Sequence, residues 1–180
     1  MKNKVKILIG LLVLLLSAVT YGQSQWEIRQ DYSITFSGTG AEGSFRGLEG
    51  SIQFDPDNLD QSQFNVSINP ATISTGNKTK NKHARGDSWF DVEKYTKVGF
   101  VSEEIKKTDG GYVAEGMLTM HGVSNKDQIN FTFSRQQSNM GLFEGIMKVN
   151  REDYGIEGPL ISFMVGDEFE VRISLPVKKE

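Results

Sequence analysis

Apolar and polar residues alternate along most of the chain, in short stretches that turn-forming residues separate. Tyr32, Ile34 and Phe36 alternate with polar neighbours, and the same period of two recurs at residues 51–54, 64–69, 129–134 and 169–175. Successive side chains of a strand point to opposite faces, so each stretch has one apolar and one polar face. The pattern predicts about eight strands, each buried on one side only.

Short turn sequences connect these stretches, which indicates an antiparallel sheet in up-and-down order. Asp109, Gly110 and Gly111 separate two alternating stretches and predict a hairpin, and His121-Gly122 predicts the next turn. Closing such a sheet into a barrel removes the exposed edges that it would otherwise have to protect. We therefore expect an all-β fold, an antiparallel β-barrel of about eight strands with one short helical insertion. A two-sheet sandwich is the alternative.

One stretch, residues 73–95, does not follow the strand pattern. Asn77 is suited to be the N-cap of a short helix over Lys78–Arg85, and Gly86 is expected to end that helix. Trp89 and Phe90 follow side by side. This aromatic pair has two interpretations, either a lid over one end of the barrel or a buried anchor for a crossover between strands.

The inward faces of the predicted strands carry both large and very small residues. Gly116 and Gly145 fall on apolar faces, so the barrel either holds a small ligand or uses these glycines to ease strand curvature. On the first interpretation, leucine at either position is expected to block the interior tunnel and leave the fold intact. The residues predicted to point inward are Tyr32, Ile34, Phe36, Ile52, Phe54, Phe64, Val66, Ile68, Leu118, Phe131, Phe133, Phe143, Met147, Phe169, Val171 and Ile173.

The N-terminus has the composition of a secretory signal peptide. Lys2, Lys4 and Lys6 precede an apolar run over residues 7–19, and cleavage is expected after Gly22. The run is too short for a membrane span. We therefore expect a leader at residues 1–22, one mature domain at residues 23–180, and a periplasmic or secreted location without stable membrane insertion. The chain has no cysteine, so the core alone holds the fold.

Composition and motifs favour a binding protein over an enzyme. The formal net charge is −3 and the leader carries three lysines, so the mature chain is more acidic still, and nucleic acid is not an expected partner. His83 and His121 are the only histidines, and no nucleophile elbow or metal-ligand spacing accompanies them. We expect no catalytic residue, no metal and no cofactor. His83 stands in a basic run with Lys78, Lys80, Lys82 and Arg85, which is typical of a solvated helix face.

Five motifs, in order along the mature chain, resemble the YceI-like, polyisoprenoid-binding family. They are Gly43-Ser44-Phe45 with residues 50–56; Ser74-Thr75-Gly76-Asn77, His83-Ala84-Arg85 and residues 89–95; residues 116–123; residues 149–156; and residues 165–168. The resemblance implies a lipocalin-like barrel with a helical segment, exported to the periplasm of Gram-negative bacteria. It also implies binding of a long isoprenoid, such as a polyprenyl quinone or polyprenyl phosphate, along the barrel axis.

These observations predict an exported carrier of an isoprenoid or other long-chain lipid, with a homodimer as a possible assembly. The alternative is a non-catalytic structural or stress-related interaction protein whose own side chains fill the barrel. At the mouth, Arg85, Lys82 or His83 is expected to meet a phosphate head group, or Trp89 to pack on a quinone ring. Arg85 could instead pair with Asp87 or Asp91 and only hold the crossover. The predicted ligand-binding residues are Phe36, Phe54, Phe64, Val66, Ile68, His83, Arg85, Trp89, Phe90, Leu118, Phe131, Phe133, Phe143, Met147, Phe169 and Val171.

Overall fold

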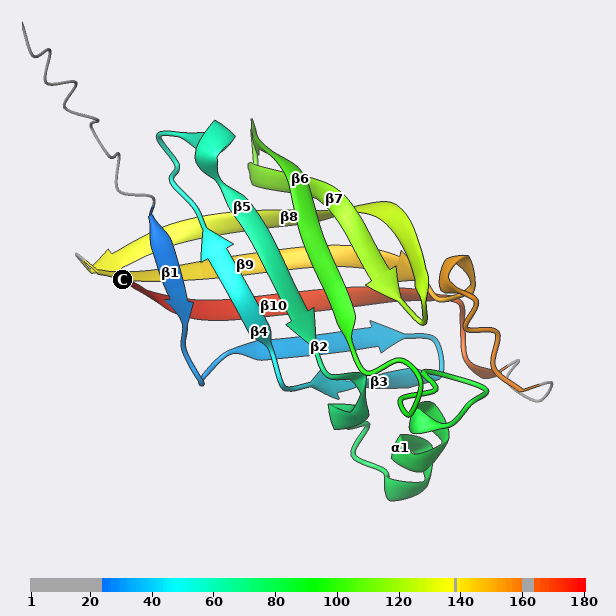
Figure 1. Ribbon diagram of the computed structural model, residues 1–180. Helices are drawn as coiled ribbons and strands as arrows, with labels where there is room; N and C mark the ends of the chain where they lie inside the picture. Colours follow the sequence, from blue (N-terminus) through cyan, green and yellow to red (C-terminus); the bar gives the residue numbers. More distant parts are fainter. Residues whose placement is uncertain (1–23, 138, 160–163) are drawn as a thin grey trace, which may run out of the picture.

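A single antiparallel sheet that closes on itself dominates the structure, a computed structural model that describes residues 24–137, 139–159 and 164–180 (Figure 1). The predicted leader, residues 1–22, lies outside the described residues. The strands are β1 (Gln25–Ile28), β2 (Ser33–Gly38), β3 (Ala41–Phe45), β4 (Glu49–Gln53), β5 (Gln63–Ile68), β6 (Val98–Thr108), β7 (Gly111–Met120), β8 (Val123–Gln137), β9 (Met140–Asn150) and β10 (Glu168–Lys179). The helices are α1 (Lys78–Arg85) and the 3₁₀ turns η1 (Leu59–Gln61), η2 (Pro70–Thr72) and η3 (Glu152–Tyr154).

The ten strands make eight passes along the barrel wall. The first two passes are each broken in the middle, so that β1 and β2 form one pass and β3 and β4 form the next. Strand β10 closes the ring, because it pairs with β9 on one side and with both β1 and β2 on the other. The closed antiparallel barrel of about eight strands that the sequence predicts is therefore confirmed, and the sandwich is wrong.

Alternation places the predicted apolar faces inside the barrel. All sixteen residues predicted to point inward belong to the core cluster or pack against it. The hairpins at Asp109–Gly111 and His121-Gly122 are also present, and His121 takes the left-handed backbone conformation that such a tight turn needs, with φ at 53°. The period of two is therefore a reliable guide to which side chains face inward.

Aromatic rings fill the half of the barrel that lies away from α1. Phe54 is 0% exposed, and its ring centroid lies 5.1–5.5 Å from those of Tyr112, Phe131, Phe133 and Phe143. Trp26 Nε1 donates a hydrogen bond of 2.9 Å to the Phe54 carbonyl, which satisfies the indole inside the core. We call this group, with Phe64 as its further member, the aromatic block.

The predicted helix forms with the predicted cap. Asn77 Oδ1 accepts hydrogen bonds from the backbone N–H of Thr79 (2.9 Å) and Lys80 (3.0 Å), and the helix ends at Gly86. A two-residue bridge between Ser44 and Ser74 ties the preceding segment to β3, so α1 lies at one end of the barrel (Figure 1). None of the helices in the described part of the chain is long and apolar enough to cross a membrane.

The two glycines predicted to open a tunnel serve other purposes. A Cβ on Gly116 would lie 2.1 Å from the Val101 carbonyl oxygen, because β6 bulges towards it between Ser102 and Glu104. A Cβ on Gly145 would lie 3.1 Å from Cγ2 of Ile129. At Gly116 the expectation that leucine blocks the interior without disturbing the fold is therefore wrong, since leucine there collides with the backbone of β6. At Gly145 it stays a prediction.

The aromatic block predicts that replacing a phenylalanine inside it by alanine lowers the free energy of unfolding more than the same change in the other half of the barrel. Phe54→Ala removes a ring that is packed on all sides and should lower the free energy of unfolding by about 3–5 kcal/mol. Phe169→Ala, in the other half of the barrel, should cost about half as much, because Phe169 is only partly buried. Urea unfolding of both variants measures the difference, and equal costs would contradict the division of the barrel into two unlike halves.

Candidate functional site

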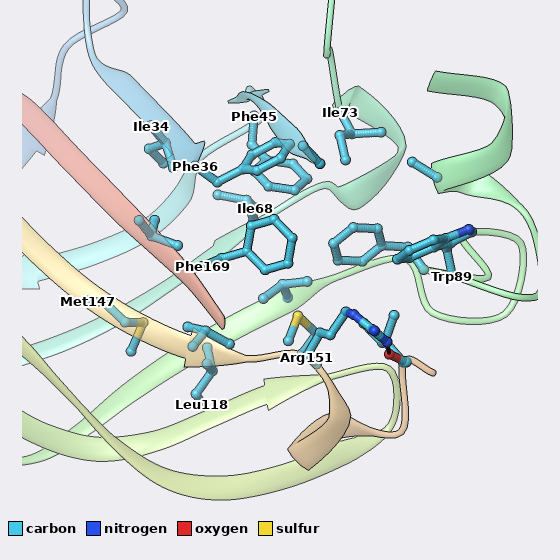
Figure 2. A pocket seen from close by; sticks show the side chains of 18 of the residues that line it. Ile34, Phe36, Phe45, Ile68, Ile73, Trp89, Leu118, Met147, Arg151 and Phe169 are labelled. Carbon is cyan, nitrogen blue, oxygen red and sulfur yellow. Dashed lines mark hydrogen bonds between the residues drawn. The ribbon is translucent and has the colours of Figure 1, made fainter. Parts of the chain in front are cut away.

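An apolar cavity of about 390 Å³ occupies the half of the barrel nearest α1 (Figure 2). This volume falls within the range of pockets that hold small molecules. Its lining comes from most of the barrel strands and includes Ile34, Phe36, Phe45, Val66, Ile68, Phe100, Leu118, Met120, Met147, Val149, Phe169, Val171 and Ile173. The cavity therefore offers an apolar ligand a nearly continuous hydrocarbon surface.

The structure divides the predicted ligand-binding residues into two groups. The cavity is lined by Phe36, Val66, Ile68, His83, Trp89, Phe90, Leu118, Met147, Phe169 and Val171. Five others, Phe54, Phe64, Phe131, Phe133 and Phe143, belong to the aromatic block and do not line it. The cavity is thus a half-barrel pocket, and the expected tunnel along the whole barrel axis is wrong because the protein's own rings occupy the other half.

Trp89 and Phe90 form part of the cavity wall at its α1 end. The Phe90 ring meets the Phe45 ring edge-on, with centroids 5.7 Å apart. The backbone N–H of Trp89 donates to the Gly86 carbonyl (3.0 Å) and that of Phe90 to the Ala84 carbonyl (3.0 Å). The end of α1 therefore fixes the aromatic pair against the barrel, and both rings border the space that a ligand would occupy (Figure 2).

Arg85 does not take either position expected for it. Its Nη2 donates to the Ile73 carbonyl (3.0 Å), and it is not among the residues that line the cavity. Within the described part of the chain it has no ion pair with Asp87 or Asp91, and its Nε is buried without a hydrogen-bond partner. Arg85 instead holds the segment before α1 against the helix and does not border the cavity.

The buried cation that lines the cavity is Arg151, which sequence reasoning missed. Its side chain is 9% exposed, and its guanidinium carbon lies 5.5 Å from the centroid of the Trp89 ring (Figure 2). The guanidinium donates to the carbonyls of Gly166, Ile156 and Glu157 and to the Asp167 carboxylate. These bonds offset the cost of burying the charge. The only sequence signal for this role is the position of Arg151 within the motif at residues 149–156.

The remaining polar lining lies at the mouth of the cavity. Thr75, Lys80 and His83 border it there, and the side chains of Lys80 and His83 are exposed. Among the described residues, no three histidine or acidic side chains lie close enough together to hold a metal ion. The arrangement suits a ligand whose apolar part is buried and whose polar end stays at the rim.

A polar cluster outside the barrel holds the wall that carries Arg151. The Tyr154 hydroxyl donates to Asp127 Oδ2 (3.2 Å), and burial raises the pKa of both groups above their ordinary values. His121 Nδ1 lies 3.3 Å from the Tyr154 carbonyl oxygen, and the His121 ring contacts the Tyr95 ring with centroids 4.5 Å apart. This cluster connects the loop after Trp89 to the loop after β9.

Comparison with known proteins identifies relatives over most of the chain. A family model described as YceI-like domain matches residues 23–177. A UPF0312 protein of Photorhabdus laumondii is 36% identical over 88 residues, which cover 49% of this chain and 46% of the relative. A UPF0312 protein of Pseudomonas savastanoi is 32% identical over 124 residues, covering 65% and 64%. The chain thus spans about half to two thirds of the length of these curated relatives.

Solved structures share the fold at lower sequence identity. BcnA of Burkholderia cenocepacia superposes with a TM-score of 0.77 at 23% identity, covering 83% of this chain and 99% of that one. A polyisoprenoid binding domain from Saccharophagus degradans, implicated in plant cell wall breakdown, superposes with a TM-score of 0.63 at 14% identity, covering 88% and 99%. At these identities the similarity concerns the barrel and its helical segment.

The half-buried carboxyl of Asp127 predicts a pH-dependent difference in stability. Because its pKa is raised in the folded state, the penalty for its charge is absent below the unfolded pKa and fully present once the pH exceeds the folded pKa. Asp127→Asn removes the charge and keeps an oxygen that can accept from Tyr154. It should therefore be more stable than the wild type at pH 7, and the gain should shrink as the pH falls towards 3.8, the ordinary pKa of an aspartate.

The matched control is Asp153→Asn, which removes a neighbouring exposed carboxylate. Urea unfolding of the three proteins across this pH range measures the effect. A variant Asp127→Asn that is less stable than the wild type at pH 7 would mean that the bond from Tyr154 to the charged carboxylate outweighs its desolvation.

Proposed function

The chain belongs to the YceI-like family, and from its half-barrel pocket we propose that it is a binding protein for an isoprenoid lipid. The observation that carries the proposal is the apolar cavity, which lies in the half of the barrel that the aromatic block does not fill and is bordered at its mouth by Thr75, Lys80 and His83. A prenyl chain is long, apolar and flexible, and so fits such a pocket. The solved domain from Saccharophagus degradans, described as polyisoprenoid binding, supports the same class of ligand.

The hydrophobic effect alone supplies enough free energy for such binding. Each buried CH₂-sized group contributes ~0.8 kcal/mol, so one isoprene unit of five carbons contributes about 4 kcal/mol before the entropic cost of binding. Because the barrel is hollow over only half of its interior, the pocket takes one end of a long chain. The rest of the chain and the head group stay near the mouth, beside Thr75, Lys80 and His83.

We place this function among carriers and not among enzymes. The polar side chains that border the cavity are those of Ser67, Thr75, Lys80, His83 and Arg151, and no hydrogen bond joins a nucleophile to a base among them within the described residues. Arg151 uses its donors on backbone carbonyls and Asp167. Such a lining holds a ligand without offering groups that would transform it. The leader predicted at residues 1–22 is the reason for proposing a periplasmic or secreted carrier.

The first test is to fill the pocket from its wall. Val171 lines the cavity on β10, and the next residue, Arg172, is exposed on the opposite face of the same strand. Organic extraction and mass spectrometry of the purified wild type should yield a stoichiometric prenyl lipid. Val171→Trp should lose it because the indole occupies the space of the chain, whereas the matched control Arg172→Trp should retain it.

Two results would contradict the proposal. One is a wild-type protein that carries no lipid and does not bind added polyprenyl quinone or polyprenyl phosphate. The other is equal lipid binding by both tryptophan variants. Either result would favour the alternative in which the barrel is a structural or interaction module.

The second test compares a residue near α1 that lines the cavity with one on α1 that only supports the fold. Trp89→Ala removes a ring from the cavity wall and should weaken lipid binding about tenfold, in line with the ~1–2 kcal/mol that a partly buried aromatic contact contributes. Arg85→Ala should leave lipid affinity unchanged and lower the melting temperature, because Arg85 bonds to Ile73 and does not line the cavity. Titration with a polyprenyl quinone, with thermal unfolding of the same samples, checks both. Weaker binding by Arg85→Ala at unchanged stability would restore Arg85 to the ligand site.

A further inference from the structure

The mouth of the pocket carries an excess of positive charge in an otherwise acidic protein. Residues 73–97 contain six lysine or arginine residues and three acidic residues, whereas the whole chain has a formal net charge of −3. On α1, Lys78, Lys80 and Lys82 are exposed, and among the described residues none of them has an ion pair. Lys78 and Lys82 lie one turn apart on the same side of α1, and we call this pair the lysine face; it presents unneutralised charge beside the opening of the cavity, which Lys80 itself lines.

An apolar side chain projects from the same rim. Met164 is 70% exposed, far more than the other exposed large apolar residues of the described chain, Val101, Val123 and Ile146, at 37–41%. The Met164 carbonyl lies over Gly40, at the β2–β3 turn, and the next residue, Val165, lines the cavity together with Gly40. Met164 therefore lies beside residues that line the cavity.

We propose that the mouth docks on an anionic lipid bilayer, with the lysine face on the head groups and Met164 inserted among them. The inference rests on the proposed function, because a carrier of an apolar chain has to receive it from a membrane or release it there. Lysines attract anionic lipid surfaces, and an exposed apolar side chain beside them adds a contact that dissolved anions cannot provide. The docked mouth would let the prenyl chain pass between bilayer and pocket without crossing water.

No acidic residue lies within α1, and some acids near it are paired with other cations. Glu152 and Asp167 lie next to Arg151, whose guanidinium is within 3.7 Å of the former and hydrogen-bonded to the latter. Lys97, on the strand side of the segment, is paired with Glu49. The positive charge of this segment is therefore concentrated on α1, which borders the cavity through Lys80 and His83.

The experiment compares two charge reversals of equal size. Lys78→Glu with Lys82→Glu alters the lysine face at two residues that do not line the cavity, while Lys107→Glu with Lys178→Glu makes the same change at exposed lysines of the far end. Co-sedimentation is measured with vesicles of equal parts phosphatidylcholine and phosphatidylglycerol, and with vesicles of phosphatidylcholine alone. Lipid bound in the pocket is quantified by mass spectrometry in the same preparations.

The wild type should bind the anionic vesicles, bind phosphatidylcholine vesicles weakly, and lose affinity as salt is added. The reversal on α1 should lower the partition coefficient at least about 30-fold, since each basic residue near an anionic surface contributes ~1 kcal/mol. The far-end reversal should change it severalfold at most. Met164→Ser should lower binding roughly tenfold at every salt concentration, whereas Val101→Ser on the barrel wall should not.

An equal loss of vesicle binding in both double variants would overturn the proposal, because binding would then depend on the net charge of the protein and not on the lysines of α1. Absence of vesicle binding by the wild type would also overturn it, and would direct attention to an acidic protein surface as the partner. The lipid content separates this failure from that of the proposed function. A protein that carries a prenyl lipid but ignores vesicles has a pocket without this docking face, whereas an empty barrel means that the proposed function itself has failed.

Discussion

The packing of aromatic rings around Phe54 is the contact on which the rest of the structure depends. Side chains can just fill the interior of an eight-stranded barrel, so whatever space they leave becomes available to a ligand. Here Phe54, Phe64, Phe131, Phe133 and Phe143 fill one half with ring contacts of 4.6–6.2 Å. That half supplies the stability of a chain without cysteine, and the other half is thereby free to remain hollow.

The cavity in the hollow half lowers the free energy of unfolding, and ligand binding would raise it again. Side chains that border an empty cavity lose dispersion contacts, and the free energy of unfolding falls with cavity size. A lipid that binds only the folded chain restores those contacts and adds stability in proportion to the logarithm of its concentration. Melting temperature should therefore report pocket occupancy, which makes Val171 and Phe169 useful positions for following the ligand.

The mouth is held by polar contacts, in contrast to the barrel interior. Arg151 satisfies its guanidinium with the carbonyls of the loop after β9 and contacts Trp89 on the opposite wall. Tyr154 and His121 connect the same loop to Tyr95. Directional hydrogen bonds fix the shape of the opening, whereas non-directional burial would hold the ligand. A carrier needs both, because its pocket has to persist while its cargo enters and leaves.

The sequence by itself determined which side chains face inward and where the helix begins. Alternation with a period of two reports the face of a strand, and Asn77 caps α1 through bonds to residues two and three positions away. Both are local properties. The resemblance to the YceI-like family correctly indicated the barrel.

Only the tertiary structure decided which inward residues fill the barrel and which line a pocket. Periodicity does not report how far along the barrel axis a side chain lies, so Phe54 and Phe36 look alike in sequence although one is in the aromatic block and the other borders the cavity. Gly116 likewise reflects the bulge of a neighbouring strand. Arg151 lines the cavity and Arg85 does not, because folding brings their partners close: the Ile73 carbonyl, 12 residues from Arg85, and the Asp167 carboxylate, 16 residues from Arg151.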